Sequence, residues 1–254
     1  MPRPADRPPD RHAVSLADPL GQLARLEGVA SAMAAARDGI DSLLRGRGLR
    51  GAAPDLTAES LLRGAHASAV LEGARCTVEE LQDGGGGPEA RAAVRTSAEV
   101  LGLVPVLGRS PLQALARLHT LAGSGDVPDD LLGRPAGGAG AARLRELAVL
   151  LTSPTSAPAL VVAAVVHAEL AAAAPFASHN GIVARAAERL VLVARGVDAT
   201  SLTVPEAGHL ALRQQYESNL RGYAVGGPSG VHGWLLYAAE AFAKGAESSP
   251  LARR

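Results

Sequence analysis

Aromatic residues are nearly absent from this chain of 254 residues, which contains two Phe, three Tyr and one Trp. Hydrophobic residues nevertheless make up 47% of the sequence, a share typical of a globular protein. A core built from these residues must therefore consist mainly of Leu, Val and Ala. Such small aliphatic side chains suit helices that approach each other closely.

Cysteine is almost absent as well, and the charges balance. The single cysteine, Cys76, excludes an intrachain disulfide and a metal site made of several cysteines. Its thiol could have a depressed pKa beside Arg75, or it could be a small apolar group in the core. Lys plus Arg and Asp plus Glu each number 25, so the net charge is zero. We therefore expect neither a nucleic acid nor a membrane as partner.

Long apolar runs and targeting segments are also lacking. The longest apolar candidate, residues 157–174, is interrupted by His167 and Glu169. The N-terminus, MPRPADRPPDRH, is charged and rich in proline, with no apolar stretch behind it. It is not a secretory signal, so we expect a disordered lead-in over residues 1–14 and a cytoplasmic protein.

The pattern of apolar residues is helical through most of the chain. Helices are predicted at 15–44, 57–71, 88–104, 111–122, 141–152, 157–172, 182–194, 205–223 and 228–246. A short further helix begins at Thr77, where Glu80 completes a capping box. The sequence thus predicts one all-α domain of about eight helices over residues 15–247. It comprises an N-terminal extension (15–83) and a core (88–247), joined by four glycines and followed by a flexible tail (248–254).

The segment from Ala174 to Arg185 resembles a phosphate-binding loop that leads into a helix. Asn180 and Gly181 would allow a phosphate to approach the backbone at the helix N-terminus, and Arg185 could contact it one turn later. The segment could instead be an ordinary turn, with Ser178 as the helix cap and Arg185 on the surface.

Two motifs in this order resemble those of the Fic (Fido) family. The family signature is His-x-Phe-x-(Asp/Glu)-Gly-Asn-Gly-Arg-x-x-Arg. Its positions correspond here to Ala174, Phe176, Ser178, His179, Asn180, Gly181, Ile182 and Arg185. Upstream, Ser68, Glu72 and Gly73 match the family's inhibitory motif, (Ser/Thr)-x-x-x-Glu-(Gly/Asn), in the class whose inhibitory helix precedes the core. The regions Leu118-His119-Thr120, Gly133-Arg134 and Tyr216 to Trp234, together with His167, also resemble the family.

The resemblance implies an all-helical protein that binds ATP and transfers AMP to a hydroxyl group of a target protein. The signature histidine is the general base, but Ala174 cannot accept a proton. The signature acid holds the metal, but Ser178 is a poor ligand for Mg²⁺. Ile182 replaces the first phosphate-binding arginine, and His179 replaces a glycine. His179 could substitute for the base, but a turn residue with local hydrogen bonds is the commoner role.

The second arginine, Arg185, is retained, and the resemblance implies that Glu72 pairs with it and blocks the productive pose of the γ-phosphate. The same pair could instead tie the N-terminal helix to the core.

We therefore expect a degenerate relative of the AMP transferases, impaired in catalysis. Its expected partners are a nucleotide and a target or regulatory protein, without a bound metal. Two alternatives remain: an active transferase with altered chemistry or donor, and a helical interaction protein without enzymatic activity.

Overall fold

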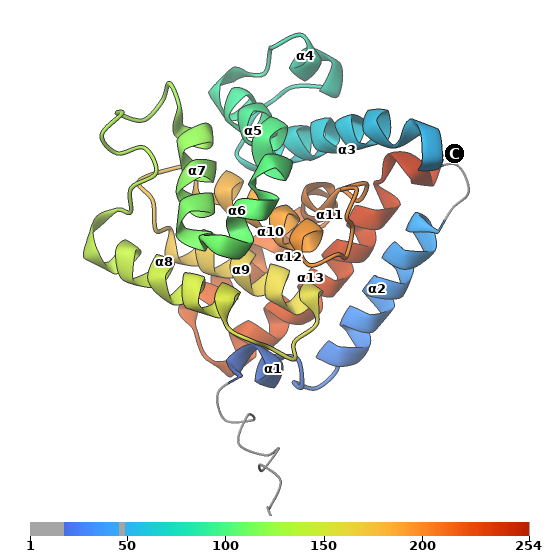
Figure 1. Ribbon diagram of the computed structural model, residues 1–254, viewed down its shortest axis with the longest axis vertical. Helices are drawn as coiled ribbons and strands as arrows, with labels where there is room; N and C mark the ends of the chain where they lie inside the picture. The colour runs from blue at the N-terminus through green and yellow to red at the C-terminus, as the bar shows by residue number, and fades with distance from the viewer. Residues whose placement is uncertain (1–17, 46–48, 254) are drawn as a thin grey trace, which may run out of the picture.

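The computed structural model describes residues 18–45 and 49–253, and these residues form an all-α fold (Figure 1). The helices are α1 (Pro19–Leu23), α2 (Val29–Leu44), α3 (Leu49–Leu71), α4 (Val78–Gln82), α5 (Gly87–Glu99), α6 (Val104–Arg109), α7 (Pro111–Gly123), α8 (Gly137–Thr152), α9 (Ala159–Ala173), α10 (Asn180–Ala194), α11 (Pro205–Ala211), α12 (Arg213–Val225) and α13 (Pro228–Glu247). Two 3₁₀ turns, η1 (Val100–Leu103) and η2 (Pro250–Arg253), complete the set. The predicted lead-in at 1–14 lies outside the described residues.

The pair α9 and α10 forms the centre of the molecule (Figure 1). Every residue from Leu160 to Ala168 and from Ile182 to Leu192 is buried, so both helices are surrounded by protein on all sides. A single hydrophobic cluster extends from Leu20 in α1 to Ala246 in α13. The N-terminal helices therefore share one core with the rest of the chain.

Small residues allow the helices to cross closely, as expected for a core with few aromatic side chains. At the crossing of α11 and α13, a Cβ atom on Gly208 would overlap the carbonyl oxygen of Ala241. Where α13 faces α9, the only tryptophan, Trp234, donates from Nε1 to the carbonyl of Ala164 at 2.8 Å. All three tyrosines, Tyr216, Tyr223 and Tyr237, lie around Trp234.

The described residues contain more helices than the sequence predicts, because two predicted helices are each divided and α6 follows η1 where the sequence predicts no helix. The predicted helix 15–44 is interrupted between α1 and α2, where Gly28 has a φ of 74°. Asp18 caps α1 through Gly21 (2.8 Å) and also accepts hydrogen bonds from Thr155 and Ser156. The predicted helix 205–223 divides at Leu212, although no glycine or proline adjoins that residue.

The C-terminal segment differs from the predicted flexible tail. Ser249 and Pro250 are buried, and η2 packs against α3. The carbonyl of Ser248 accepts a hydrogen bond from Arg63 of α3 at 3.0 Å. The described part of this segment is therefore packed onto the N-terminal extension. Among the described residues, no helix is both long enough and apolar enough to cross a membrane.

Candidate nucleotide site

The loop between α9 and α10 is held in place at its first residues. Ala174 ends α9 in the left-handed conformation, with a φ of 42°. The carbonyl of Pro175 then accepts a hydrogen bond from Ala136 at 2.7 Å, and Phe176 forms an isolated β-bridge with Pro135. A Cβ atom on Gly140 would come within 2.6 Å of the Pro175 carbonyl oxygen, so glycine is needed at this approach.

Phe176 fixes the loop to α7. Its ring stacks on the His119 ring, with centroids 4.3 Å apart and an angle of 5° between the planes. His119 Nδ1 accepts a hydrogen bond from the backbone of Gly133 at 2.9 Å. Burial, with a smaller contribution from His179, lowers the pKa of His119 to about 4. His119 is therefore neutral near pH 7. Its contacts join α7 to Phe176 of the loop and to Gly133, and each of these three segments carries part of the resemblance to the family.

Asn180 closes the loop around Phe176. Its side-chain oxygen accepts from the Phe176 N–H at 3.0 Å, and its amide donates to the Phe176 carbonyl at 2.9 Å. His179 precedes α10 with a φ of 57°, and its Nδ1 lies 2.7 Å from the Ser178 hydroxyl. The expected alternative of Ser178 as the helix cap is not found, because its hydroxyl pairs with His179 instead.

The three replaced signature positions have different surroundings. Ala174 is exposed and Ser178 is half-buried, so both lie where a ligand could reach them. Ile182 is 2% exposed and belongs to the hydrophobic cluster. The position of the first signature arginine has therefore become part of the core.

Arg185 is buried, with 1% of its surface exposed, and so is not the surface residue of the alternative interpretation. It donates from Nε to the Ser68 hydroxyl (2.9 Å), from Nη2 to Glu72 Oε1 (2.5 Å), and from Nη1 to the Tyr216 hydroxyl (3.3 Å). Burial alone would lower the pKa of Arg185, but Tyr216 and Glu72 raise it. The guanidinium is thus charged, and its forked face is already occupied.

Glu72 reaches this position because α3 ends one residue before it. Gly73 has a φ of 102°, and the Ala74 N–H bonds back to the Ala69 carbonyl, as in a Schellman motif. A Cβ atom on Gly181 would overlap Glu72 Oε1, so the carboxylate lies directly against the first turn of α10. A helix N-terminus favours an anion there, and Glu72 occupies that place.

Two further buried groups lie behind the loop, and the sequence predicted neither. Arg189 of α10 forms two hydrogen bonds with Glu206 of α11, at 2.8 and 2.6 Å. Glu188 contacts two buried histidines, His167 and His209. The signal that could have revealed them is the pattern of charged residues at 185, 188 and 189. They share one face of an otherwise apolar helix, whose burial requires partners for them.

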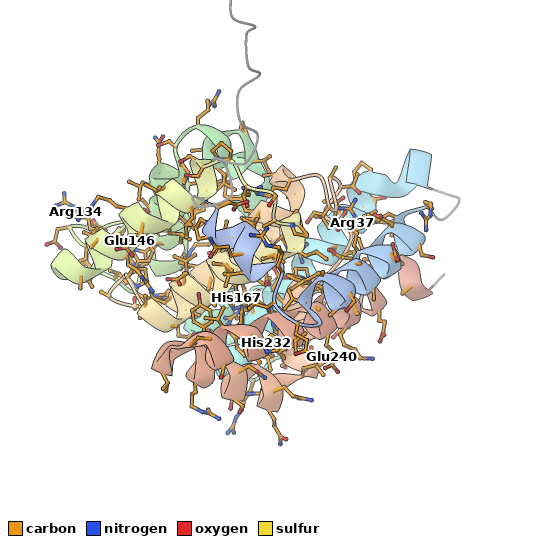
Figure 2. All side chains as sticks on the ribbon, turned by 90° about the horizontal axis from the view of Figure 1, so that it is seen from below. Arg37, Arg134, Glu146, His167, His232 and Glu240 are labelled. Carbon is orange, nitrogen blue, oxygen red and sulfur yellow. The ribbon has the colours of Figure 1, made fainter. Side chains whose placement is uncertain are left out.

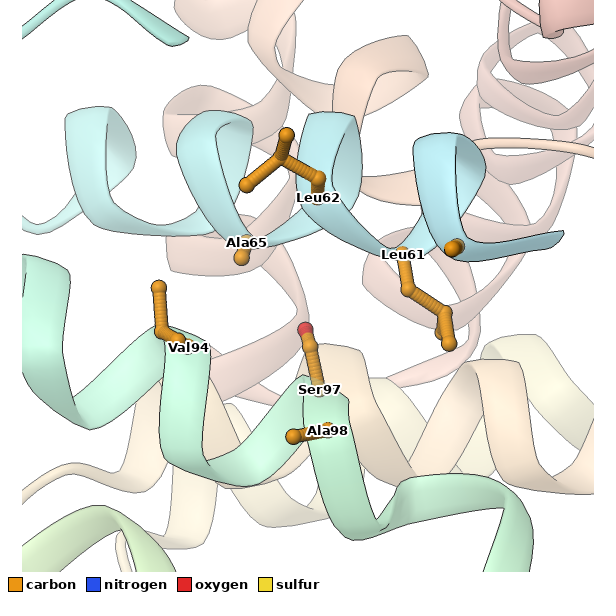
Figure 3. Close-up of a pocket in the computed structure, with 7 residues that line it drawn as sticks. Leu61, Leu62, Ala65, Val94, Ser97 and Ala98 are labelled. Atoms are coloured by element: carbon orange, nitrogen blue, oxygen red, sulfur yellow. The ribbon is translucent and has the colours of Figure 1, made fainter. Parts of the chain in front are cut away.

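The lone thiol and a surface groove stand apart from this site. Burial raises the pKa of Cys76, so the alternative of a reactive thiol finds no support. An apolar groove lies between α3 and α5, lined by residues that include Leu62 and Val94 (Figure 3). No residue of the loop lines it.

Comparisons with known proteins identify the fold. No protein-family model and no curated protein sequence matches the chain. Among solved structures, a Fic family protein from Desulfovibrio desulfuricans G20 is similar, with a TM-score of 0.68 and 21% identity, over 85% of this chain and 73% of that one. Fic-1 (residues 134–508) from C. elegans is similar, with a TM-score of 0.68 and 13% identity, over 86% of this chain and 71% of that one.

These likenesses cover most of the chain, and the described residues are all-α as the sequence predicted. The protein therefore has the Fic fold.

Proposed function

We propose that this protein is a Fic-fold relative of the AMP transferases that has lost ordinary AMP transfer and keeps a nucleotide-binding or regulatory role controlled by Glu72. The observation that carries this proposal is the contrast within one loop. The contacts that shape the loop are intact, whereas the groups that would perform the chemistry are replaced.

The loss of catalysis is supported by the chemistry of the replaced side chains. Ala174 offers a methyl group where a proton acceptor is needed. The Ser178 hydroxyl engages Nδ1 of His179, so only Nε2, which lies 3.9 Å from Asp126 Oδ2, could replace the missing base. Three replaced groups that act as a unit reduce a rate by several orders of magnitude.

Mg²⁺ does not fit the residues at this loop. Ser178 supplies a neutral hydroxyl that is already hydrogen-bonded, whereas protein sites for Mg²⁺ usually contain at least one carboxylate.

A nucleotide phosphate fits once Glu72 is displaced. The first backbone N–H groups of α10 have no partner within the helix, and they form an anion site with Arg185 behind them. Glu72 now fills this place. Its side chain is 30% exposed, so it can swing away into solvent, whereas Arg185 is buried and stays.

The test uses wild type, Glu72→Ala and a control, Glu217→Ala, which removes an exposed carboxylate of α12 that pairs with Arg213. Calorimetry with a panel of nucleotides should show weak or no binding to wild type and the control, and binding to Glu72→Ala. Incubation with labelled ATP and Mg²⁺ should label neither the protein nor a lysate.

Two results would contradict the proposal in different ways. Robust labelling by Glu72→Ala would show that catalysis persists and would favour the transferase with altered chemistry. The absence of binding to any nucleotide, in all three proteins, would remove the nucleotide role and favour a helical interaction protein.

A further inference from the structure

A second cluster of chemically active side chains lies in the interior, separate from the loop. His167 of α9, Glu188 of α10 and His209 of α11 meet there, and each is fully buried. His167 is inside the molecule, whereas Arg134 and Glu146 lie at its edge (Figure 2). Three helices that are separate in sequence thus bring two imidazoles and one carboxylate to a single point.

The facing atoms of this cluster are not all paired by hydrogen bonds. His167 Nδ1 lies 3.1 Å from Glu188 Oε1, yet neither atom has a hydrogen-bond partner. His209 Nε2 lies 2.8 Å from the other oxygen, Glu188 Oε2. Buried polar atoms without a partner are rare, so two such atoms side by side suggest that both contact a further group.

The arrangement of these atoms matches that of metal ligands. One ligand atom from each residue lies within 4.8 Å of the other two. Ligands about 2.0 Å from a tetrahedral zinc ion are about 3.3 Å from one another, close to the His167–Glu188 separation. Each imidazole faces an oxygen of the same carboxylate, so the two nitrogens and the Glu188 carboxylate can supply three ligands to one ion.

The outer nitrogens of the two rings are held by tyrosines. His167 Nε2 lies 3.1 Å from the Tyr216 hydroxyl, and His209 Nδ1 lies 2.7 Å from the Tyr237 hydroxyl. Such contacts fix the orientation of metal-binding histidines and leave the inner nitrogens free to bind.

The charge around the cluster also suits a cation. The two neighbouring guanidiniums, Arg185 and Arg189, are paired with Glu72 and Glu206 respectively. Glu188 therefore remains as a carboxylate whose contacts within the cluster are two histidines.

We propose that His167, Glu188 and His209 bind one divalent transition-metal ion, with zinc as the best match to two imidazoles and a carboxylate. The ligands are distinct from the residues of the nucleotide loop, although the Tyr216 hydroxyl contacts both His167 and Arg185. Because its ligands are fully buried, the ion enters during folding and joins α9, α10 and α11 beneath the loop.

The first test measures the metal content of the full chain, produced without a polyhistidine tag and without chelators. Elemental analysis should find about one equivalent of a transition metal, as a fully built site requires. His209→Gln and Glu188→Gln should lose the metal. His232→Gln is the matched control and should retain it, because His232 lies outside the cluster, with its Nε2 2.7 Å from the Glu27 carbonyl oxygen.

The second test avoids variants that fail to fold. Wild type is unfolded in denaturant and refolded with either a chelator or Zn²⁺. Refolding with Zn²⁺ should raise the Tm and restore the metal content, and refolding with Co²⁺ should produce visible ligand-field absorption. Wild type that is metal-free after purification and after refolding with Zn²⁺, with the same Tm in chelator, would overturn the proposal.

Discussion

At the residue scale, Gly181 determines whether Glu72 can sit against α10. Its position in the first turn of the helix would ordinarily favour alanine by about 0.5–1 kcal/mol. Here the added Cβ atom would overlap the Glu72 carboxylate and also lie 3.2 Å from Arg185 Nη1. The glycine is therefore required by the contact with Glu72 and not by the backbone.

We expect Gly181→Ala to destabilise wild type and to be neutral or stabilising in Glu72→Ala. The two substitutions should show a coupling of about 1 kcal/mol, because each changes the same contact. Urea unfolding of the four proteins measures it. Additive effects would mean that Glu72 does not lie against Gly181 in solution.

Another residue-scale feature is His119, which accepts the Gly133 N–H through Nδ1 and so must stay neutral. Its pKa is about 4 in the native state and 6.5 ordinarily. Between these two pH values, His119 is mostly protonated in the unfolded chain and mostly neutral in the native protein. This histidine therefore makes stability fall as the pH drops from about 6.5 to about 4, and the loss stops below that range.

His119→Asn keeps an acceptor near the place of Nδ1 and removes the titration. Its stability should fall less steeply with pH over that range, by up to about 1.4 kcal/mol per pH unit relative to wild type. Denaturant unfolding of wild type and His119→Asn at several pH values measures this difference in stability. The other histidines contribute equally to both proteins, so their contribution cancels. Parallel curves would show that His119 does not titrate in this range.

At the element scale, the ion pair of Arg189 and Glu206 joins α10 to α11, and further contacts extend it to α3. Arg189 Nη1 donates to the Ser201 hydroxyl (2.7 Å), the Thr203 carbonyl (3.0 Å) and the Ser60 hydroxyl (3.2 Å). Both charged side chains are almost fully buried. Removing one of them leaves the other charge without a partner.

We expect Arg189→Met to cost about 3–5 kcal/mol, because Glu206 remains buried and unpaired. The matched control is Arg213→Ala, which breaks an exposed pair with Glu217 and should cost at most about 0.5 kcal/mol. Chemical unfolding of both variants provides the comparison. Equal costs would indicate that the Arg189 network is solvated.

At the scale of the whole molecule, the N-terminal extension and the core form one hydrophobic cluster. Ile40 of α2 and Leu115 of α7 are both buried within it. The helix α2 packs along α13, so the two ends of the chain stabilise each other (Figure 1). One core of this kind predicts a single cooperative unfolding transition.

Ile40→Ala should therefore destabilise the entire molecule, by about 2–5 kcal/mol. The fluorescence of Trp234, which lies in α13, should report the same lowered midpoint as the far-ultraviolet circular dichroism. Leu236→Ala, at an exposed position of α13, serves as the control and should change little. Separate transitions for the two probes would mean that the extension unfolds independently.

The sequence by itself determined the features that depend on local chemistry. The capping box at Thr77 and Glu80 forms as predicted, because its hydrogen bonds join residues three apart. The all-α class follows from periodicity, which the chain carries in nearly every segment. The loop from Ala174 to Arg185 could also be identified from the sequence, together with the signature positions at which its side chains are replaced.

Only the tertiary structure decided which charged residues lie in the interior. Arg189 and Glu188 look like ordinary residues of a helix in the sequence, and for Arg185 only the resemblance to the family implied a partner. Their partners Glu72, Glu206 and the two histidines come from other helices, and the helix crossings bring them together. A charge inside a protein requires a partner from another element, and the sequence alone does not specify how those elements cross.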